Sequence, residues 1–197
     1  MMQNFREGYF FSWMQRPEEI NWSEISTIPN YRVAEQCLNT NYYGTKRVIE
    51  ALLPLQESLI FLPVLNFPNG WAKEVLSDAE RLTEEKIDSV LIRFLEDFKK
   101  VDTEVWFPIF PPYTVSKADL NRYTRILAKK YPNFCINCVS PGFVKTDITF
   151  NVGNLTINEG AENLVRLALL PNGGPTGLYF SQKEVASFLV LNSLCTM

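Results

Sequence analysis

Histidine is absent from this sequence of 197 residues. Histidine is the side chain whose unperturbed pKa lies nearest neutrality, and it is the commonest metal ligand in proteins. Its absence excludes Ser-His-Asp catalysis, Cys-His catalysis and any histidine-ligated metal site. Acid–base chemistry would have to use tyrosine, lysine, aspartate, glutamate or cysteine. We therefore expect no metal centre.

Long apolar runs and a charge excess are absent as well. No run approaches the roughly 18 apolar residues of a membrane span, and the first residues hold no uninterrupted apolar segment of signal-peptide length. The net charge is −3 and the sequence pI is about 5.2, so nothing indicates nucleic acid or an anionic membrane as partner. With 46% hydrophobic and 21% charged residues, we expect one globular, reduced, cytoplasmic domain over residues 1–197.

Cysteine is scarce, with four in the chain, and two of them form a C-x-x-C motif, Cys135 and Cys138. Such a motif can be a redox pair. However, the pair lies in the apolar segment "FCINCVS", which reads as a buried strand. Residues three apart on a strand point to opposite faces. The sequence therefore favours two core cysteines over a redox pair.

Helical and strand patterns alternate along the chain. The predicted strands and helices alternate in an order typical of an α/β fold with a parallel sheet. The predicted elements are a helix after Pro29, a strand in 58–67, a short helix in 71–80, a helix at 83–100, a helix at 113–131, a strand at 134–140, a helix from Thr156 to before Pro171, and a short strand at 178–181. The 83–100 helix has one apolar stripe, which is either core or the docking face of an interaction module.

A tyrosine and a lysine four residues apart occur three times: Tyr42 with Lys46, Tyr113 with Lys117, and Tyr179 with Lys183. The first pair has Gly44 between its members, and the third straddles a strand end, where this spacing brings no contact. The second opens a helix that feeds a strand ending in Pro-Gly. In a doubly wound sheet, ligands bind beyond the carboxyl ends of strands, so Tyr113 and Lys117 are the pair best placed for chemistry.

The spacing of Tyr113 and Lys117 has a chemical rationale. One helical turn places the ammonium near the phenol, and a positive charge nearby lowers a phenol pKa from its usual value of about 10. Such a phenol can give a proton to a carbonyl oxygen or take one from an alcohol. The alternative is a tyrosine packed on the core beside a solvated lysine, and the spacing alone favours that alternative.

Three longer blocks change this balance: "YTVSKADLNRYTRILAKK", "NCVSPGFVKTDI" and, upstream, "CLNTNYYGTKRVIEALLPL". They resemble the short-chain dehydrogenase/reductase family, and the likeness is closest to plant members that act on terpenoid-like or alkaloid-like carbonyls. The resemblance covers roughly residues 18–188. It implies a partial Rossmann-type fold, α/β with a doubly wound, mainly parallel sheet, and a helical insertion near 70–100.

The resemblance also implies a reaction and a set of roles. The reaction is hydride transfer between NADP(H) and a small-molecule ketone or secondary alcohol, and the insertion implies a monomer. Tyr113 would be the general acid/base, Lys117 would lower its pKa and bind the nicotinamide ribose, and Asn41 would hold a water linking the lysine to solvent. Four residues would border the nicotinamide carboxamide and the phosphates: Pro141, Gly142, Val144 and Thr146.

Two features of the family pattern are missing. Only Gly8 precedes Gly44, so the Gly-rich turn of the first βαβ unit is absent and the chain corresponds to the C-terminal two-thirds of the fold. No serine lies between Ser58 and Ser77, where the family has a serine that polarises the carbonyl. These departures leave a second interpretation open, a catalytically inactive truncated homologue or a gene-model variant.

Overall fold

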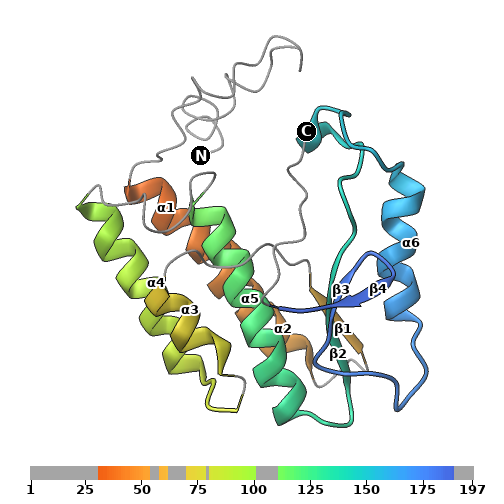
Figure 1. The fold of residues 1–197 in the computed structure, drawn as a ribbon, viewed down its shortest axis with the longest axis horizontal. Coiled ribbons are helices and arrows are strands. Elements are labelled where there is room, and N and C mark those ends of the chain that lie inside the picture. The colour runs from red at the N-terminus through yellow and green to blue at the C-terminus, as the bar shows by residue number, and fades with distance from the viewer. Residues whose placement is uncertain (1–30, 54–57, 62–69, 79, 101–110, 189–197) are drawn as a thin grey trace.

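The computed structural model describes residues 31–53, 58–61, 70–78, 80–100 and 111–188. Figure 1 shows a group of helices on one side and a small sheet with a further helix on the other. Within these residues no helix is long and apolar enough to cross a membrane, and no cluster of His, Cys, Asp and Glu could hold a metal ion. The expected domain over 1–197 extends beyond them and stays a prediction.

The sheet has four strands in the order β1-β2-β3-β4. The first three are parallel, in the register that sets Ser58 opposite Cys135 and Ser140 opposite Ser181. The fourth is antiparallel to β3. The bounds are β1 Ser58–Phe61, β2 Cys135–Ser140, β3 Tyr179–Ser181 and β4 Glu184–Ala186. The predicted mainly parallel α/β sheet is confirmed, whereas β4 was missed, because three residues of Glu-Val-Ala carry almost no strand signal.

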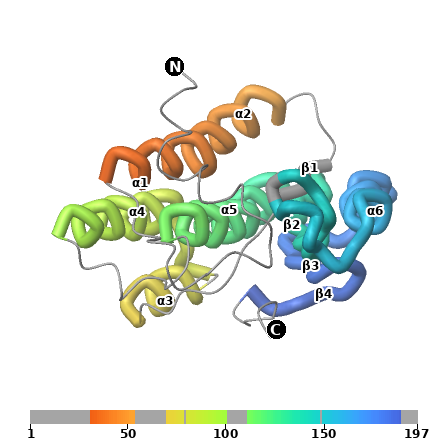
Figure 2. The backbone as a smooth tube through the Cα atoms, turned by 90° about the horizontal axis from the view of Figure 1, so that it is seen from above, coloured from red at the N-terminus to blue at the C-terminus, as the bar shows by residue number. Residues whose placement is uncertain are grey.

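Helices cover both faces of this sheet. Helix α5 (Pro111–Lys130) packs against β1 and β2 on one face, and α6 (Ile157–Ala168) packs on the same strands from the other side, as Figure 2 shows from above. Helix α5 ends two residues before Pro132, which cannot continue a helix. A capping box joins Thr156 and Glu159 at the start of α6, as the sequence predicted.

The helix expected after Pro29 forms, but it is not uniform. An α-helix, α1 (Tyr31–Leu38), runs into a π-helix (Asn39–Gly44) and continues as α2 (Thr45–Leu52). The wider i→i+5 turns shift the phase of every later residue. The apolar residues of this segment recur at a 3.6-residue spacing in the sequence, which predicts one buried stripe. That prediction is right for Ala34 and Tyr42, which are buried, and wrong for Val48 and Leu52, which are 57% and 41% exposed.

Helix α4 (Glu84–Lys99) packs against α1 and α5, and α3 (Gly70–Ser77) packs against α4. Thr83 caps α4 by accepting a hydrogen bond from the Lys86 N–H at 3.4 Å, as a threonine directly before a helix commonly does. Five of the six residues of its apolar stripe are buried and the sixth, Leu95, is half-buried against the same core, so the stripe is core and the interpretation as a docking face is wrong. The buried members are Ile87, Val90, Leu91, Phe94 and Phe98.

Both cysteines of the C-x-x-C motif lie on β2, where they are buried and carry free thiols. Burial raises the pKa of the Cys138 thiol to about 12, because the thiolate would lose its solvation. A thiol held neutral in this way is a poor nucleophile. The expectation of core cysteines is confirmed.

Candidate active site

The carboxyl ends of the parallel strands define one edge of the sheet. Helix α5 directly precedes β2 in the chain and runs in the opposite direction. The start of α5 and the segment that follows β2 therefore lie at the same, upper end of Figure 1. Ligands of doubly wound folds bind at this edge. Both groups of predicted site residues are therefore on elements that reach it.

Tyr113 and Lys117 stand one turn apart at the start of α5, as predicted. Pro111 and Pro112 occupy the first turn, where a proline fits because its missing N–H would have no intrahelical partner. The Tyr113 side chain is 45% exposed, although its neighbours on the helix are buried. The ammonium of Lys117 lies 5.8 Å from the centre of the Tyr113 ring. The pair thus presents an accessible phenol with a cation beside its ring.

Asn41 reaches this pair from the π-helix. Its Nδ2 donates hydrogen bonds to the Ser116 hydroxyl oxygen at 3.2 Å and to the Cys37 sulfur at 3.4 Å. The Ser116 hydroxyl in turn donates to the Tyr113 carbonyl oxygen at 2.7 Å. Single π-turns inside helices are frequent at functional sites. The structure therefore ties Asn41 to the helical turn that carries Tyr113 and Lys117, and it adds Ser116 and Cys37, which the sequence did not single out.

The electrostatics of the cluster differ from the expectation. Desolvation raises the pKa of Tyr113, and a smaller contribution from Cys37 acts in the same direction. Desolvation also lowers the pKa of Lys117, because burial disfavours its charged form. The expected lowering of the tyrosine pKa by Lys117 is wrong for this geometry. The physical reason is that partial burial outweighs a cation that lies beside the ring at 5.8 Å.

In the other two tyrosine–lysine pairs, the lysine forms an ion pair with a glutamate and not a contact with its tyrosine. Tyr42 is fully buried, and its raised pKa follows from desolvation first and from the nearby carboxyl groups second. Lys46 forms an ion pair with Glu84 at 2.6 Å. Tyr179 lies within β3, and Lys183 in the following turn pairs with Glu162 instead, at 3.0 Å. Among the three, the pair on α5 has the accessible phenol.

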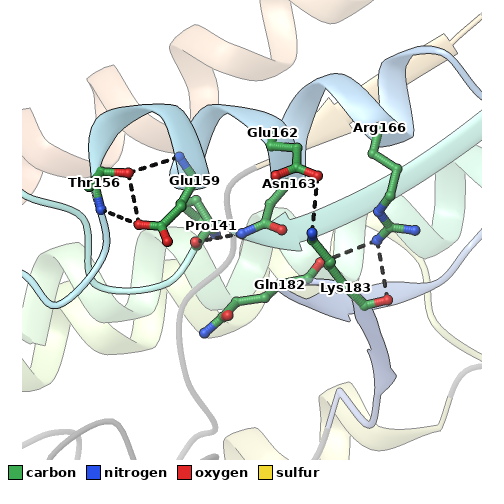
Figure 3. A network of polar contacts seen from close by, with 8 residues as sticks. All are labelled: Pro141, Thr156, Glu159, Glu162, Asn163, Arg166, Gln182 and Lys183. Atoms are coloured by element: carbon green, nitrogen blue, oxygen red, sulfur yellow. Dashed lines mark hydrogen bonds and ion pairs between the residues drawn. The ribbon is translucent and has the colours of Figure 1, made fainter.

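The loop after β2 carries the other predicted residues, and its first part is fixed by α6. The side-chain amide of Asn163 donates to the Pro141 carbonyl oxygen at 3.0 Å, from a position that is almost fully buried (Figure 3). Gly142 has φ +94°, and a Cβ there would collide with the Leu155 side chain. The left-handed φ thus favours glycine at this position, and a side chain there would also displace the end of the Leu155 side chain.

The second part of the loop is fixed by backbone pairing. Val144 forms an isolated parallel bridge with Leu155, and its side chain packs on Gly160 of α6, where a Cβ would collide with it. Thr146 caps a single 3₁₀ turn (Asp147–Thr149) by a reciprocal pair of bonds with Thr149. Pro141, Gly142, Val144 and Thr146 therefore form one anchored loop at the carboxyl edge.

Ser58 lies too far from the candidate residues to replace the serine that the family pattern leads one to expect. It begins β1 opposite Cys135, the first residue of β2, so it lies at the amino end of the parallel strands. The candidate residues stand at the other end. The structure gives Ser58 no place among them, in agreement with the sequence, which did not assign it the role of the family's serine.

Comparison with known proteins finds relatives among plant dehydrogenases and reductases. It is 49% identical over 185 residues to (+)-neomenthol dehydrogenase of Capsicum annuum, covering 87% of this chain and 59% of that protein. It is 46% identical over 186 residues to short-chain dehydrogenase/reductase 1 of Saponaria officinalis, covering 88% and 61%. The chain spans about three-fifths of the length of these curated relatives.

A more distant relative is the rat protein named carbonyl reductase 1, with the qualifier NADPH, which is 30% identical over 84% of this chain and 66% of its own length. The structure of salutaridine reductase from Papaver somniferum superimposes with a TM-score of 0.72 at 43% identity, covering 77% of this chain and 55% of that one. No family model matches the chain. The identity to short-chain dehydrogenase/reductase 1 and the fold shared with salutaridine reductase agree with the three sequence blocks. The chain belongs to the short-chain dehydrogenase/reductase family.

Proposed function

We propose that the chain is an NADP(H)-dependent oxidoreductase that interconverts a ketone and a secondary alcohol. The observation that carries the proposal is the accessible phenol of Tyr113, with Lys117 one turn away and Asn41 tied to its helix through Ser116. The substrate class, a terpenoid-like or alkaloid-like carbonyl, is supported by the names of neomenthol dehydrogenase and salutaridine reductase. NADP rather than NAD is supported by the name of the rat relative.

The donor groups at the carboxyl edge fit a nicotinamide nucleotide. The phenol of Tyr113 and the ammonium of Lys117 can hydrogen-bond ribose hydroxyls, and the anchored loop offers fixed backbone groups at the same edge of the sheet. Pro141, Gly142, Val144 and Thr146 would border the nicotinamide carboxamide and the phosphates. The cofactor supplies the hydride when it is bound.

The protein, and not the cofactor, would supply the proton that the reaction needs. Tyr113 would donate it to the carbonyl oxygen during reduction and accept it from the alcohol during oxidation. Since burial holds the phenol pKa above its usual value, the neutral phenol is the resting form, which suits the reductive direction. Lys117 would bind the ribose, and Asn41 would hold the water that connects Lys117 to solvent. Loss of the family's serine donor is expected to slow turnover by about 10²–10³.

Two further proposals concern the state of the protein. A monomer is supported by α4, whose apolar stripe is already covered by α1 and α5 and is not left to a second copy. A cytoplasmic location is supported by Cys37, Cys135 and Cys138, which carry free thiols, as is usual in a reducing compartment. Sedimentation of the purified chain and localisation of a tagged chain test them.

Titration of the purified chain with NADPH, followed by nicotinamide fluorescence, tests the proposed function. Saturable binding is expected, and Lys117→Ala should weaken it about 10-fold or more, because a charged hydrogen bond is lost. Lys130→Ala, an exposed lysine at the far end of α5, is the matched control and should bind as wild type does. A parallel titration with NADH tests the preference for NADP. A folded sample without saturable binding would contradict the proposal.

A further inference from the structure

Gln182 lies beside the anchored loop, although the sequence did not single it out. It is the first residue of the two-residue turn that joins β3 to β4. Its backbone N–H donates to the Ser140 carbonyl oxygen at 2.8 Å. Ser140 is the last residue of β2 and directly precedes Pro141. The turn therefore sits at the carboxyl edge, next to the start of the loop.

Side chains of α6 hold this turn in place. Nη2 of Arg166 donates to the carbonyl oxygens of Gln182 and Lys183, at 3.3 Å each. The ammonium of Lys183 pairs with Glu162 one helical turn earlier, at 3.0 Å. Figure 3 shows these contacts fastening the turn to the same helix face that holds Pro141 through Asn163. The turn and the loop thus share one support.

The backbone of Gln182 is in an unfavourable conformation. Its φ of 55° lies in the left-handed region, which costs a non-glycine residue about 1–2 kcal/mol. Glycine or asparagine would be the usual choice for such a turn. Unfavourable backbone conformations concentrate at functional sites, where the side chain has a use that offsets the cost. A long amide side chain at this point therefore calls for an explanation by its contacts.

The side chain of Gln182 points toward the loop and not toward its support. A Cβ added to Gly142 would lie 3.2 Å from Nε2 and 3.4 Å from Cδ of Gln182, so the carboxamide packs over this glycine. In Figure 3 the carboxamide extends away from α6. Within the described part of the chain, no hydrogen bond of this carboxamide is recorded. A donor and an acceptor are therefore available beside Gly142.

We propose that Gln182 is a cofactor-binding residue whose carboxamide hydrogen-bonds the carboxamide of the nicotinamide ring. This inference rests on the proposed function, in which the Gly142 loop borders that group. Two carboxamides are complementary, since each offers an N–H donor and a carbonyl acceptor. The rigid support from Arg166 and Ser140 lets Gln182 make these bonds without ordering a mobile loop.

Fluorescence titrations of Gln182→Ala and of the control Glu184→Ala, at an exposed side chain of β4, test the proposal. The ligands are NADPH and its 3-acetylpyridine analogue, in which a methyl ketone replaces the carboxamide. Gln182→Ala should weaken NADPH binding by about 5- to 10-fold, as for one or two neutral hydrogen bonds, and should weaken analogue binding less. Glu184→Ala should leave both affinities unchanged. Gln182→Asn, which keeps the amide group, should recover part of the loss.

The outcomes separate the two levels of inference. Equal NADPH affinities for wild type and Gln182→Ala would overturn the role of Gln182 alone. Equal losses for NADPH and the analogue, accompanied by a lower free energy of unfolding in urea, would show a structural role and overturn it too. Absence of NADPH binding by the folded wild-type chain would overturn the proposed function and this inference with it.

Discussion

The loop Pro141–Thr146 and the turn Tyr113–Lys117 lie at the same edge of the sheet, but they are held in different ways. The loop is fastened by the Asn163 amide, by pairing with Leu155 and by a reciprocal cap at its end. The turn is held by burial of its core-facing residues, such as Val115, and by the Ser116 hydroxyl, which links it to Asn41. Its reactive phenol is 45% exposed, and the nearest cation is 5.8 Å from the ring centre.

The difference suggests a division of labour. The loop proposed to border the nicotinamide carboxamide and the phosphates is preorganised, whereas the Tyr113 phenol and the Lys117 ammonium are proposed to reach their working geometry with ligands bound. Catalytic contacts are often long in ligand-free enzymes and tighten in the complex. The raised pKa of Tyr113 fits this view for the ligand-free protein. A bound cofactor that drew the Lys117 ammonium toward the hydroxyl would bring a positive charge closer and lower the phenol pKa. Substitutions on the two sides should therefore fail in different ways.

The largest effect is expected on the proton-transfer side. Tyr113→Phe removes the proposed acid and should lower the rate of ketone reduction by about 10²- to 10⁴-fold, the usual contribution of general acid–base catalysis. NADPH affinity should change far less. Tyr179→Phe is the matched control, since Tyr179 belongs to a tyrosine–lysine pair that is split between β3 and the next turn. The measurement is kcat with a panel of cyclic ketones, beside the NADPH titration.

Comparable losses of kcat in Tyr113→Phe and Tyr179→Phe would contradict the proposal that Tyr113, in the α5 pair, is the general acid. A Tyr113→Phe variant that keeps its turnover would remove the proposed mechanism, because no other described phenol combines exposure with a lysine one turn away. Loss of NADPH affinity without loss of kcat would show that Tyr113 binds the cofactor but does not transfer the proton.

A smaller effect, but on folding as well as binding, is expected for the loop. Gly142→Ala meets both a positive φ of 94° and a collision with Leu155, so we expect a loss of about 2–4 kcal/mol in the free energy of unfolding. Gly173→Ala is the matched control, because its φ is +80° and its Cβ would meet no atom within 4 Å. It should cost about 1 kcal/mol. Urea denaturation of both variants measures the difference, and equal costs would show that Gly142 is there for its φ alone.

Several features were predictable because their causes are local. Thr83 and Thr156 begin helices by bonding N–H groups three residues ahead, and Pro132 stops one. The placement of Tyr113 and Lys117 on one helix face needed only the 3.6-residue period. These features depend on residues that are neighbours in the chain, so a sequence contains them in full.

Other features depend on residues brought together from a distance. The hydrogen bond between Asn41 and Ser116 joins positions 75 apart. The direction of the Tyr113 pKa shift depends on how deeply the fold buries it, which a spacing rule cannot supply. The π-helix has no recognised sequence signal, and its wider turns invalidated the stripe at Val48 and Leu52. The role of Gly142 was attributed to resemblance, whereas its φ and its contact with Leu155 give the physical cause.

The smallest expected effect concerns a carboxyl group behind the reactive turn. Asp119 of α5 is completely buried, and neither of its oxygens has a hydrogen-bonding partner within the described residues. Desolvation raises its pKa, Arg122 opposes this with its positive charge, and Asp88 adds to it. The folded protein therefore keeps a proton on Asp119 at pH values where the unfolded chain has released it. Stability from this group is present below the unfolded pKa and is lost as pH rises toward the folded pKa.

Asp119→Asn should remove this dependence, because an amide is neutral at every pH in question. Relative to wild type, the variant should gain roughly 1 kcal/mol or more in free energy of unfolding between pH 5 and pH 8. Glu184→Gln, on the exposed strand β4, is the control and should show no such gain. A gap between Asp119→Asn and wild type that stays constant with pH would mean that Arg122 keeps Asp119 ionised in the fold. The core-facing side of α5 would then hold a buried ion pair between Asp119 and Arg122.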